Sequence, residues 1–169
     1  MIVGGSQGAD FLQNNLKNCM IKLSKNFEIY VNHQTSQKNY KNLETFYKEN
    51  QIKFNLFDFE ESLTELIKKT DLCITRSGAS SLAELVYLNV PFITIPFPYA
   101  KDNHQFYNGN FYKNKNCCWL IDQKSIKNNE IFDLIMNITS DHQDVESKIN
   151  QMQKISYQNT WNNINKKLL

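Results

Sequence analysis

Residues 72–84 read LCITRSGASSLAE, and this stretch decides the fold class. Its first part, Leu72–Thr75, is an apolar run with the length and composition of a short buried strand. Residues 76–80 are small or polar, as is typical of a loop, and Ser81–Leu88 then has the apolar spacing of a helix. A strand that leads through a short loop into a helix is the repeating unit of an α/β fold built on a parallel sheet.

The same alternation extends along the whole chain. Further strands are predicted at residues 1–3, 27–32, 52–57, 91–96 and 117–121. Further helices are predicted at about residues 9–25, 36–50, 60–69 and 103–115, and helical spacing continues from residue 125. A chain of 169 residues has the size of one domain. We therefore predict a single α/β domain with a Rossmann-like parallel sheet and helices on both faces.

The composition of the chain excludes several classes of protein. It is 41% hydrophobic and 21% charged, which is ordinary for a globular fold, and a net charge of +2 offers no footprint for nucleic acid. No apolar run reaches the ~18 residues of a membrane span. The cysteines lack C-x-x-C spacing and are predicted to be small buried residues in a reducing, cytoplasmic setting: Cys19, Cys73, Cys117 and Cys118. We expect neither a metal nor a cofactor.

In a parallel sheet, ligands bind where strands end and helices begin, and three loops here have suitable chemistry. The first is Gly4–Gly8, GGSQG, whose glycines allow a phosphate to approach the backbone N–H groups of a helix N-terminus. The loop is neither a Walker A motif nor G-x-G-x-x-G. Asn32 and His33 also stand where a dinucleotide fold needs an acidic residue. A tight turn without a ligand remains the alternative interpretation.

The second loop, residues 76–80, has the same position between a strand and a helix. Its hydroxyl groups come from Ser77, Ser80 and Ser81, and its accessible backbone from Gly78 and Ala79. The two helix N-termini, one after each loop, can converge on one diphosphate. Each favours an anion by up to about 1–2 kcal/mol in a partly buried site.

Two charged residues frame this second loop, and each has two interpretations. Arg76 is the only arginine among nineteen basic residues. Its planar fork could face the diphosphate or brace the loop from below, and we favour bracing. Glu84 could close a capping box with Ser81, or accept the two hydroxyl groups of a ribose.

The third loop follows the predicted strand at residues 91–96. Asp102 or Asn103 can cap the helix that comes next. His104 and Gln105 then project from its first turn, where they can hydrogen-bond a polyhydroxylated ligand. A capped helix with incidental polar side chains is the alternative.

Three motifs in this order, GGSQGA, TRSGASSLAE and PFPYAKDNHQFYN, resemble the C-terminal half of the bacterial MurG family. These are UDP-N-acetylglucosamine:N-acetylmuramyl-(pentapeptide) pyrophosphoryl-undecaprenol N-acetylglucosamine transferases. The resemblance covers essentially the whole chain, although the C-terminal part matches only in helical character. It implies one half of a glycosyltransferase-B fold, namely the domain that holds UDP-N-acetylglucosamine. The N-terminal acceptor domain is absent from this chain, and we expect that the chain begins inside a longer protein.

The resemblance also implies roles by matching position. Ser6 with Ser80 and Ser81 would hold the diphosphate, Glu84 the ribose, the backbone around Phe59 and Glu60 the uracil, and His104 with Gln105 the sugar. The full set of candidate binding residues is Ser6, Gln7, Gly8, Phe59, Glu60, Arg76, Ser77, Gly78, Ala79, Ser80, Ser81, Glu84, His104 and Gln105. No catalytic residue is expected in this chain, because the general base would belong to the missing domain. Gly109 stands where the family usually has Ala, which should weaken its helix slightly.

The implied function is inverting transfer of N-acetylglucosamine to an undecaprenyl-diphosphate-linked muramoyl-pentapeptide, in peptidoglycan synthesis. The full enzyme would lie peripherally on the cytoplasmic face of the inner membrane, and this chain alone would bind the donor without turning it over. Two alternatives remain open. One is a non-catalytic UDP-sugar-binding subunit of a split, two-chain glycosyltransferase, and the other is a sugar-nucleotide epimerase relative.

Overall fold

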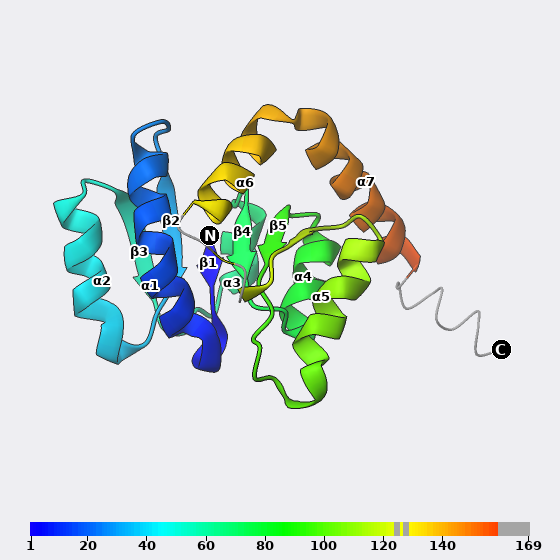
Figure 1. The fold of residues 1–169 in the computed structure, drawn as a ribbon, viewed down its shortest axis with the longest axis horizontal. Coiled ribbons are helices and arrows are strands. Elements are labelled where there is room, and N and C mark those ends of the chain that lie inside the picture. The colour runs from blue at the N-terminus through cyan, green and yellow to red at the C-terminus, as the bar shows by residue number, and fades with distance from the viewer. Residues whose placement is uncertain (124–125, 127–128, 159–169) are drawn as a thin grey trace.

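The computed structural model describes residues 1–123, 126 and 129–158, with residues 5–9, 157 and 158 described by their backbone alone. In this part of the chain, six strands form one parallel sheet in the order β3-β2-β1-β4-β5-β6 (Figure 1). The strands are β1 Ile2–Val3, β2 Tyr30–Gln34, β3 Lys53–Phe57, β4 Cys73–Thr75, β5 Phe92–Thr94 and β6 Trp119–Leu120. The prediction of a Rossmann-like parallel sheet is confirmed.

Helices connect the strands and cover the sheet. They are α1 Gly5–Ser24, α2 Gln37–Glu49, α3 Leu63–Lys68, α4 Ala79–Leu88, the short 3-10 helix η1 Lys101–Asn103, α5 His104–Asn114, α6 Glu130–Ser140 and α7 His142–Gln158. In Figure 1, α1 and α2 lie over the half of the sheet that holds β2 and β3, and α4 and α5 lie beside β4 and β5. Helices α6 and α7 run in succession along the top of the view, and α6 contacts α1 while α7 contacts α4.

Two apolar clusters show that helices cover both faces of the sheet. Successive side chains of a strand point to opposite faces. In β4, Cys73 belongs to one cluster and Ile74 to the other, and Phe92 and Ile93 divide in the same way in β5. The first cluster joins α1, α2 and α6, and the second joins α3, α4 and α7. Strands β4 and β5 are therefore buried from both sides, as their continuous apolar runs predict.

The sheet order creates a switch point between β1 and β4. From β1 the chain adds β2 and β3 on one side, and it then returns to add β4, β5 and β6 on the other. The two central strands are in register, with Ile2 opposite Ile74 and Val3 opposite Thr75. β1 and β4 are neighbours, so the loops that follow them begin next to each other at the carboxyl edge of the sheet. Sheets of this type bind ligands at such a switch point.

Two predicted boundaries near the N-terminus are wrong. Helix α1 begins at Gly5, directly after Gly4, so the predicted loop Gly4–Gly8 reduces to one residue. Gly4 already has a nearly helical backbone (φ −101°, ψ −17°), and the chain can therefore turn from strand to helix without a longer connection. The second strand is Tyr30–Gln34 instead of 27–32, because backbone N–H groups of residues 25–27 close the end of α1 by bonding to Lys22 and Leu23.

The prediction that the four cysteines are small buried residues is confirmed. Cys19, Cys73, Cys117 and Cys118 are all buried and free. Burial raises the pKa of each thiol, to about 12 for Cys19 and Cys118 and about 11 for Cys73. The thiols are therefore protonated at neutral pH and pack as small apolar groups. Over the described part of the chain, every helix is too short or too polar to pass through a bilayer.

Candidate functional site

Three strands bring the three predicted loops to the same edge of the sheet. Strand β4 pairs with β1 on one side and with β5 on the other, both in parallel. Their carboxyl ends therefore point the same way, and the loops after Val3, Thr75 and Thr94 leave the sheet side by side. The strand order therefore places the three loops at one edge of the sheet, and the convergence of two helix N-termini on one diphosphate stays a prediction.

The loop after β4 ends in an open helix N-terminus. Gly78 occupies the N-cap of α4 with an extended backbone (φ −67°, ψ 134°), and this residue makes no side-chain capping hydrogen bond. Ala79 and Ser80 are exposed, and Ser81 is half-buried. The first-turn N–H groups of a helix have no partner within the helix, so this end can bind an anion.

The capping-box interpretation of Glu84 is wrong. The helix begins at Ala79, two residues earlier than predicted, so Glu84 lies in the second turn, beyond the reach of a cap. Its Oε1 instead accepts a hydrogen bond from Thr64 Oγ1 at 2.7 Å. Thr64 belongs to α3, which packs beside α4. The Glu84 carboxylate is thus hydrogen-bonded to the start of α3.

Arg76 braces the site, but at a different loop from the one predicted. The residue is only 5% exposed. Its Nη1 donates to the carbonyl oxygens of Ile95 and Pro96, at 3.1 and 3.3 Å, in the loop that follows β5. The guanidinium carbon lies 5.0 Å from the ring centroid of Phe11 in α1 and 5.6 Å from that of Phe97. Arg76, in the loop after β4, therefore contacts both α1 and the loop after β5.

The Arg76 guanidinium also carries unused hydrogen-bonding capacity. Its Nε and Nη2 are buried and have no partner among the described residues. Burial lowers the pKa of Arg76 to about 10, so the side chain still carries its charge at neutral pH. Removing a charged group from water costs free energy unless the group is paired and hydrogen-bonded. An anion bound near Nε and Nη2 would offset part of this cost.

Ser77 contributes structure, and its hydroxyl does not face the open edge. The residue is fully buried, and its Oγ shares a hydrogen bond with Thr94 Oγ1 at 2.7 Å. Its carbonyl oxygen accepts from Asn108 Nδ2 at 3.1 Å. Gly109 packs against the same place, because a Cβ there would lie 2.8 Å from Leu120 Cδ1 and 3.0 Å from Ser77 Oγ. The glycine that appeared only to weaken α5 thus lets this helix approach the sheet closely.

The third loop is built differently from the prediction. Asp102 and Asn103 both have left-handed backbones (φ 52° and 53°), and Asn103 occupies the N-cap of α5 without a side-chain hydrogen bond. The predicted cap position at Asn103 is therefore right, but its side chain makes no capping hydrogen bond. Gln105 Oε1 accepts from the Phe97 N–H at 3.0 Å. The exposed His104 bonds through Nδ1 to the Lys101 carbonyl at 2.8 Å. A carbonyl only accepts, so Nδ1 carries the proton and Nε2 of the neutral ring is an acceptor.

The remaining candidates lie after β3 and β1. Phe59 is 81% exposed in the loop between β3 and α3, and Glu60 Oε1 accepts from the Ser62 N–H at 2.9 Å. The bond between Thr64 and Glu84 attaches this loop region to α4. The side chains of Ser6, Gln7 and Gly8 lie outside the described residues, so their predicted contacts stay predictions.

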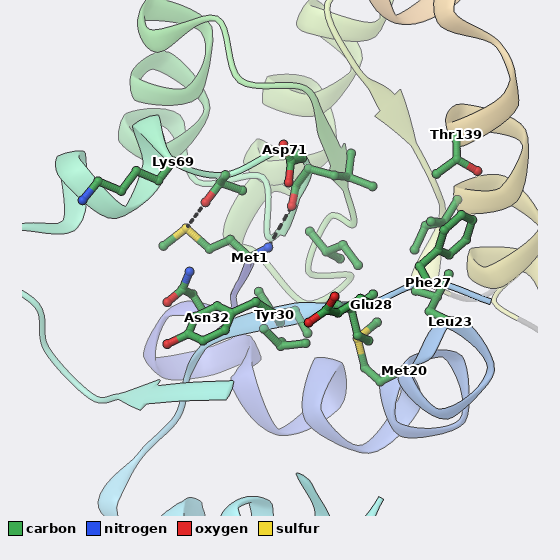
Figure 2. A pocket seen from close by; sticks show the side chains of 17 residues that line it. Met1, Met20, Leu23, Phe27, Glu28, Tyr30, Asn32, Lys69, Asp71 and Thr139 are labelled. Atoms are coloured by element: carbon green, nitrogen blue, oxygen red, sulfur yellow. Dashed lines mark hydrogen bonds between the residues drawn. The ribbon is translucent and has the colours of Figure 1, made fainter. Parts of the chain in front are cut away.

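A separate pocket lies at the opposite edge of the sheet. Figure 2 shows it at the amino ends of β1, β2 and β4, with Met1, Tyr30 and Asp71 in its wall. Its volume is about 370 Å³. The backbone nitrogen of Met1 donates to the Leu72 carbonyl at 2.8 Å. Within the described part of the chain, none of the candidate binding residues lines this pocket.

Among the described residues, no group of three or more His, Cys, Asp or Glu side chains could hold a metal ion.

Sequence reasoning missed the residues that hold the candidate site together, which are Phe11, Thr64, Thr94, Phe97 and Asn108. Each acts across a long sequence separation, and no local pattern marks it.

The family model and the curated relatives that match this chain agree on one family. The Glycosyltransferase family 28 C-terminal domain matches residues 1–167. A UDP-N-acetylglucosamine--N-acetylmuramyl-(pentapeptide) pyrophosphoryl-undecaprenol N-acetylglucosamine transferase of Pelagibacter ubique is 40% identical over all 169 residues, which cover 48% of that relative. The chain thus spans about half the length of the curated relative it matches.

Two solved structures share the fold. The crystal structure of Acinetobacter baumannii MurG superposes with a TM-score of 0.75 at 22% identity, over 90% of this chain and 44% of that one. The NMR structure of ALG13 superposes with a TM-score of 0.55 at 15% identity, over 84% of both chains. At these identities the likeness shows the fold alone.

Proposed function

We propose a function from one premise: this chain belongs to glycosyltransferase family 28, whose C-terminal domain it matches. The chain binds UDP-N-acetylglucosamine and forms the donor-binding half of an inverting N-acetylglucosamine transferase. The acceptor is the lipid-linked muramoyl-pentapeptide of peptidoglycan synthesis, the substrate in the printed names of its relatives. The observation that carries the proposal is the open N-terminus of α4 at the switch point, with the Glu84 carboxylate one turn further along the same helix.

The diphosphate binds at the switch point. The N-termini of α1 and α4 both begin there, and Ser80 and Ser81 lie in the first turn of α4. Nε and Nη2 of Arg76, which have no partner among the described residues, belong to the same region, and the guanidinium adds positive charge. These groups stabilise the negative charge that develops on UDP as it leaves the sugar.

The nucleoside lies towards α3 and the sugar towards α5. Glu84 accepts the ribose hydroxyl groups, since a carboxylate can receive two such bonds in charge-assisted geometry. The exposed Phe59 and the backbone at Glu60 meet the uracil. On the other side, His104 and Gln105 in the first turn of α5 contact the N-acetylglucosamine.

The acceptor side of the reaction belongs to a separate domain. The C4 hydroxyl of the muramoyl sugar attacks the anomeric carbon, and a general base from the acceptor domain removes its proton. The complete enzyme works peripherally at the cytoplasmic face of the membrane, where the lipid acceptor lies. This chain alone binds the donor without turning it over.

Calorimetry with UDP and UDP-N-acetylglucosamine tests the proposal. Both ligands should bind the folded chain, and no N-acetylglucosamine should be released. Glu84→Gln should weaken UDP binding by roughly tenfold or more, because a charge-assisted hydrogen bond is worth about 1.5–3 kcal/mol. Glu44→Gln is the matched control, since Glu44 pairs with Lys48 on α2, far from the switch point. A folded chain that binds neither ligand would refute the proposal.

A further inference from the structure

A hydrogen bond between Thr64 and Glu84 lies beside the candidate site. Thr64 is the second residue of α3, and Glu84 is the sixth residue of α4. Thr64 Oγ1 lies 2.7 Å from Glu84 Oε1. An ionised carboxylate can only accept, so the threonine hydroxyl is the donor. The bond joins side chains twenty residues apart on two adjacent helices.

This bond contributes little to stability. Thr64 is exposed and Glu84 is half-exposed, so water would satisfy both groups if the bond were absent. A typical hydrogen bond contributes only about 0.5–1.5 kcal/mol net, and exposed ones fall at the lower end. Its main consequence is the orientation of the carboxylate.

We infer that Thr64 is a positioning residue that orients the Glu84 carboxylate for the two vicinal hydroxyl groups of a ribose. This inference rests on the proposed function. An unrestrained glutamate side chain loses up to about 1.5–2 kcal/mol of rotamer entropy when a ligand fixes it. Thr64 fixes one carboxylate oxygen before the ligand arrives, so part of this loss no longer opposes binding.

The choice of a hydroxyl as the orienting group is informative. The nearby lysine of α3, Lys68, pairs with Glu65 and not with Glu84. A lysine bonded to Glu84 would neutralise the carboxylate and compete for its oxygens. Threonine instead takes one of about four acceptor positions and leaves the charge, with three positions, for two ribose hydroxyls.

Thr64 also couples the two ends of the nucleoside site. It lies near the start of α3, directly after the loop that holds Phe59 and Glu60. The hydrogen bond to Glu84 therefore holds the proposed uracil loop against the proposed ribose ligand. A nucleoside that meets both would find them already in place.

Calorimetry with two ligands and three variants tests this role. Thr64→Val keeps the shape of the side chain and removes the hydroxyl, and Thr64→Ser keeps the hydroxyl. Thr64→Val should weaken UDP binding roughly three- to tenfold, in line with the entropy that preorganisation saves. The loss for 2′-deoxy-UDP should be smaller, so the preference for UDP over 2′-deoxy-UDP should fall. Thr64→Ser should behave as the wild type, and Glu65→Gln, which breaks the neighbouring pair with Lys68, should leave UDP affinity unchanged.

A double-mutant cycle gives a readout that a merely structural role would not move. In a Glu84→Gln background, Thr64→Val should cause no further loss of UDP affinity. Wild-type affinity for UDP in Thr64→Val would overturn the inference. Equal losses for UDP and 2′-deoxy-UDP would also overturn it, because a distorted fold would weaken both. A wild-type chain that fails to bind UDP would overturn the proposed function, and the inference with it.

Discussion

Replacing Arg76 with lysine should destabilise the fold although the charge is kept. Lysine can reach only one of the two carbonyl oxygens of Ile95 and Pro96, so one hydrogen bond to a charged group is lost, worth roughly 1 kcal/mol or slightly more. The flat guanidinium between the rings of Phe11 and Phe97 is lost as well, at about 0.5 kcal/mol for each ring.

The burial of position 76 destabilises the lysine variant further. An ammonium is more strongly hydrated than a guanidinium, so it costs more to place at a position that is only 5% exposed. The sum is a loss of about 2 kcal/mol in the free energy of unfolding. For a chain of this size, that loss lowers the melting temperature by about 4–8 °C.

Urea unfolding followed by circular dichroism measures this difference. The matched control is the reverse exchange at an exposed ion pair, Lys53→Arg beside Glu28, which should change stability by less than about 0.5 kcal/mol. If Arg76→Lys is as stable as the wild type, the guanidinium does not brace α1 and the loop after β5. The interpretation of its contacts would then be wrong.

Three further predictions concern other parts of the molecule. Burial lowers the pKa of His33 from 6.5 to about 3. Below pH 6.5 this imidazole is therefore protonated in the unfolded chain and stays neutral in the folded chain. Between pH 7 and pH 5 the free energy of unfolding should fall by about 2 kcal/mol through this residue, and a denaturant series in which His33→Gln shows the same pH slope would contradict the assignment. Gly109→Ala should lower stability by about 1 kcal/mol, because contact with Leu120 and the buried hydroxyl behind it outweighs the gain in helix propensity; a raised melting temperature would show that the sheet can make room. Phe59→Ala should weaken UDP binding several-fold without changing the urea midpoint, since the ring is 81% exposed, and unchanged affinity would place the uracil elsewhere.

Local patterns were sufficient where burial from both sides of the sheet sets the sequence. Leu72–Thr75 and the run at residues 91–96 are apolar without alternation, which is what a central parallel strand requires, and both contain strands of the sheet. Element ends were less predictable. The strand predicted from residue 27 begins at Tyr30, because backbone N–H groups of residues 25–27 close α1, and α4 begins two residues before its predicted start.

The start of α4 shows how a small shift changes a functional interpretation. With Ser81 as the cap, Glu84 would bond back to the helix terminus. With Gly78 as the cap, the same carboxylate lies in the second turn and bonds to Thr64. The sequence allowed both the cap and the ribose interpretation, and only the position of the helix end removes the first.

The sequence by itself determined the class of fold, the strand ends that carry the candidate site and the family resemblance, because these depend on the order and spacing of nearby residues. The tertiary structure alone decided the sheet order that places β1 beside β4, the inward turn of Ser77, and the contacts of Arg76 and Glu84. Those contacts join residues seventeen or more positions apart, so they exist only once helices and strands have packed. Packing depends on the shape of the whole core, which no short stretch of sequence encodes.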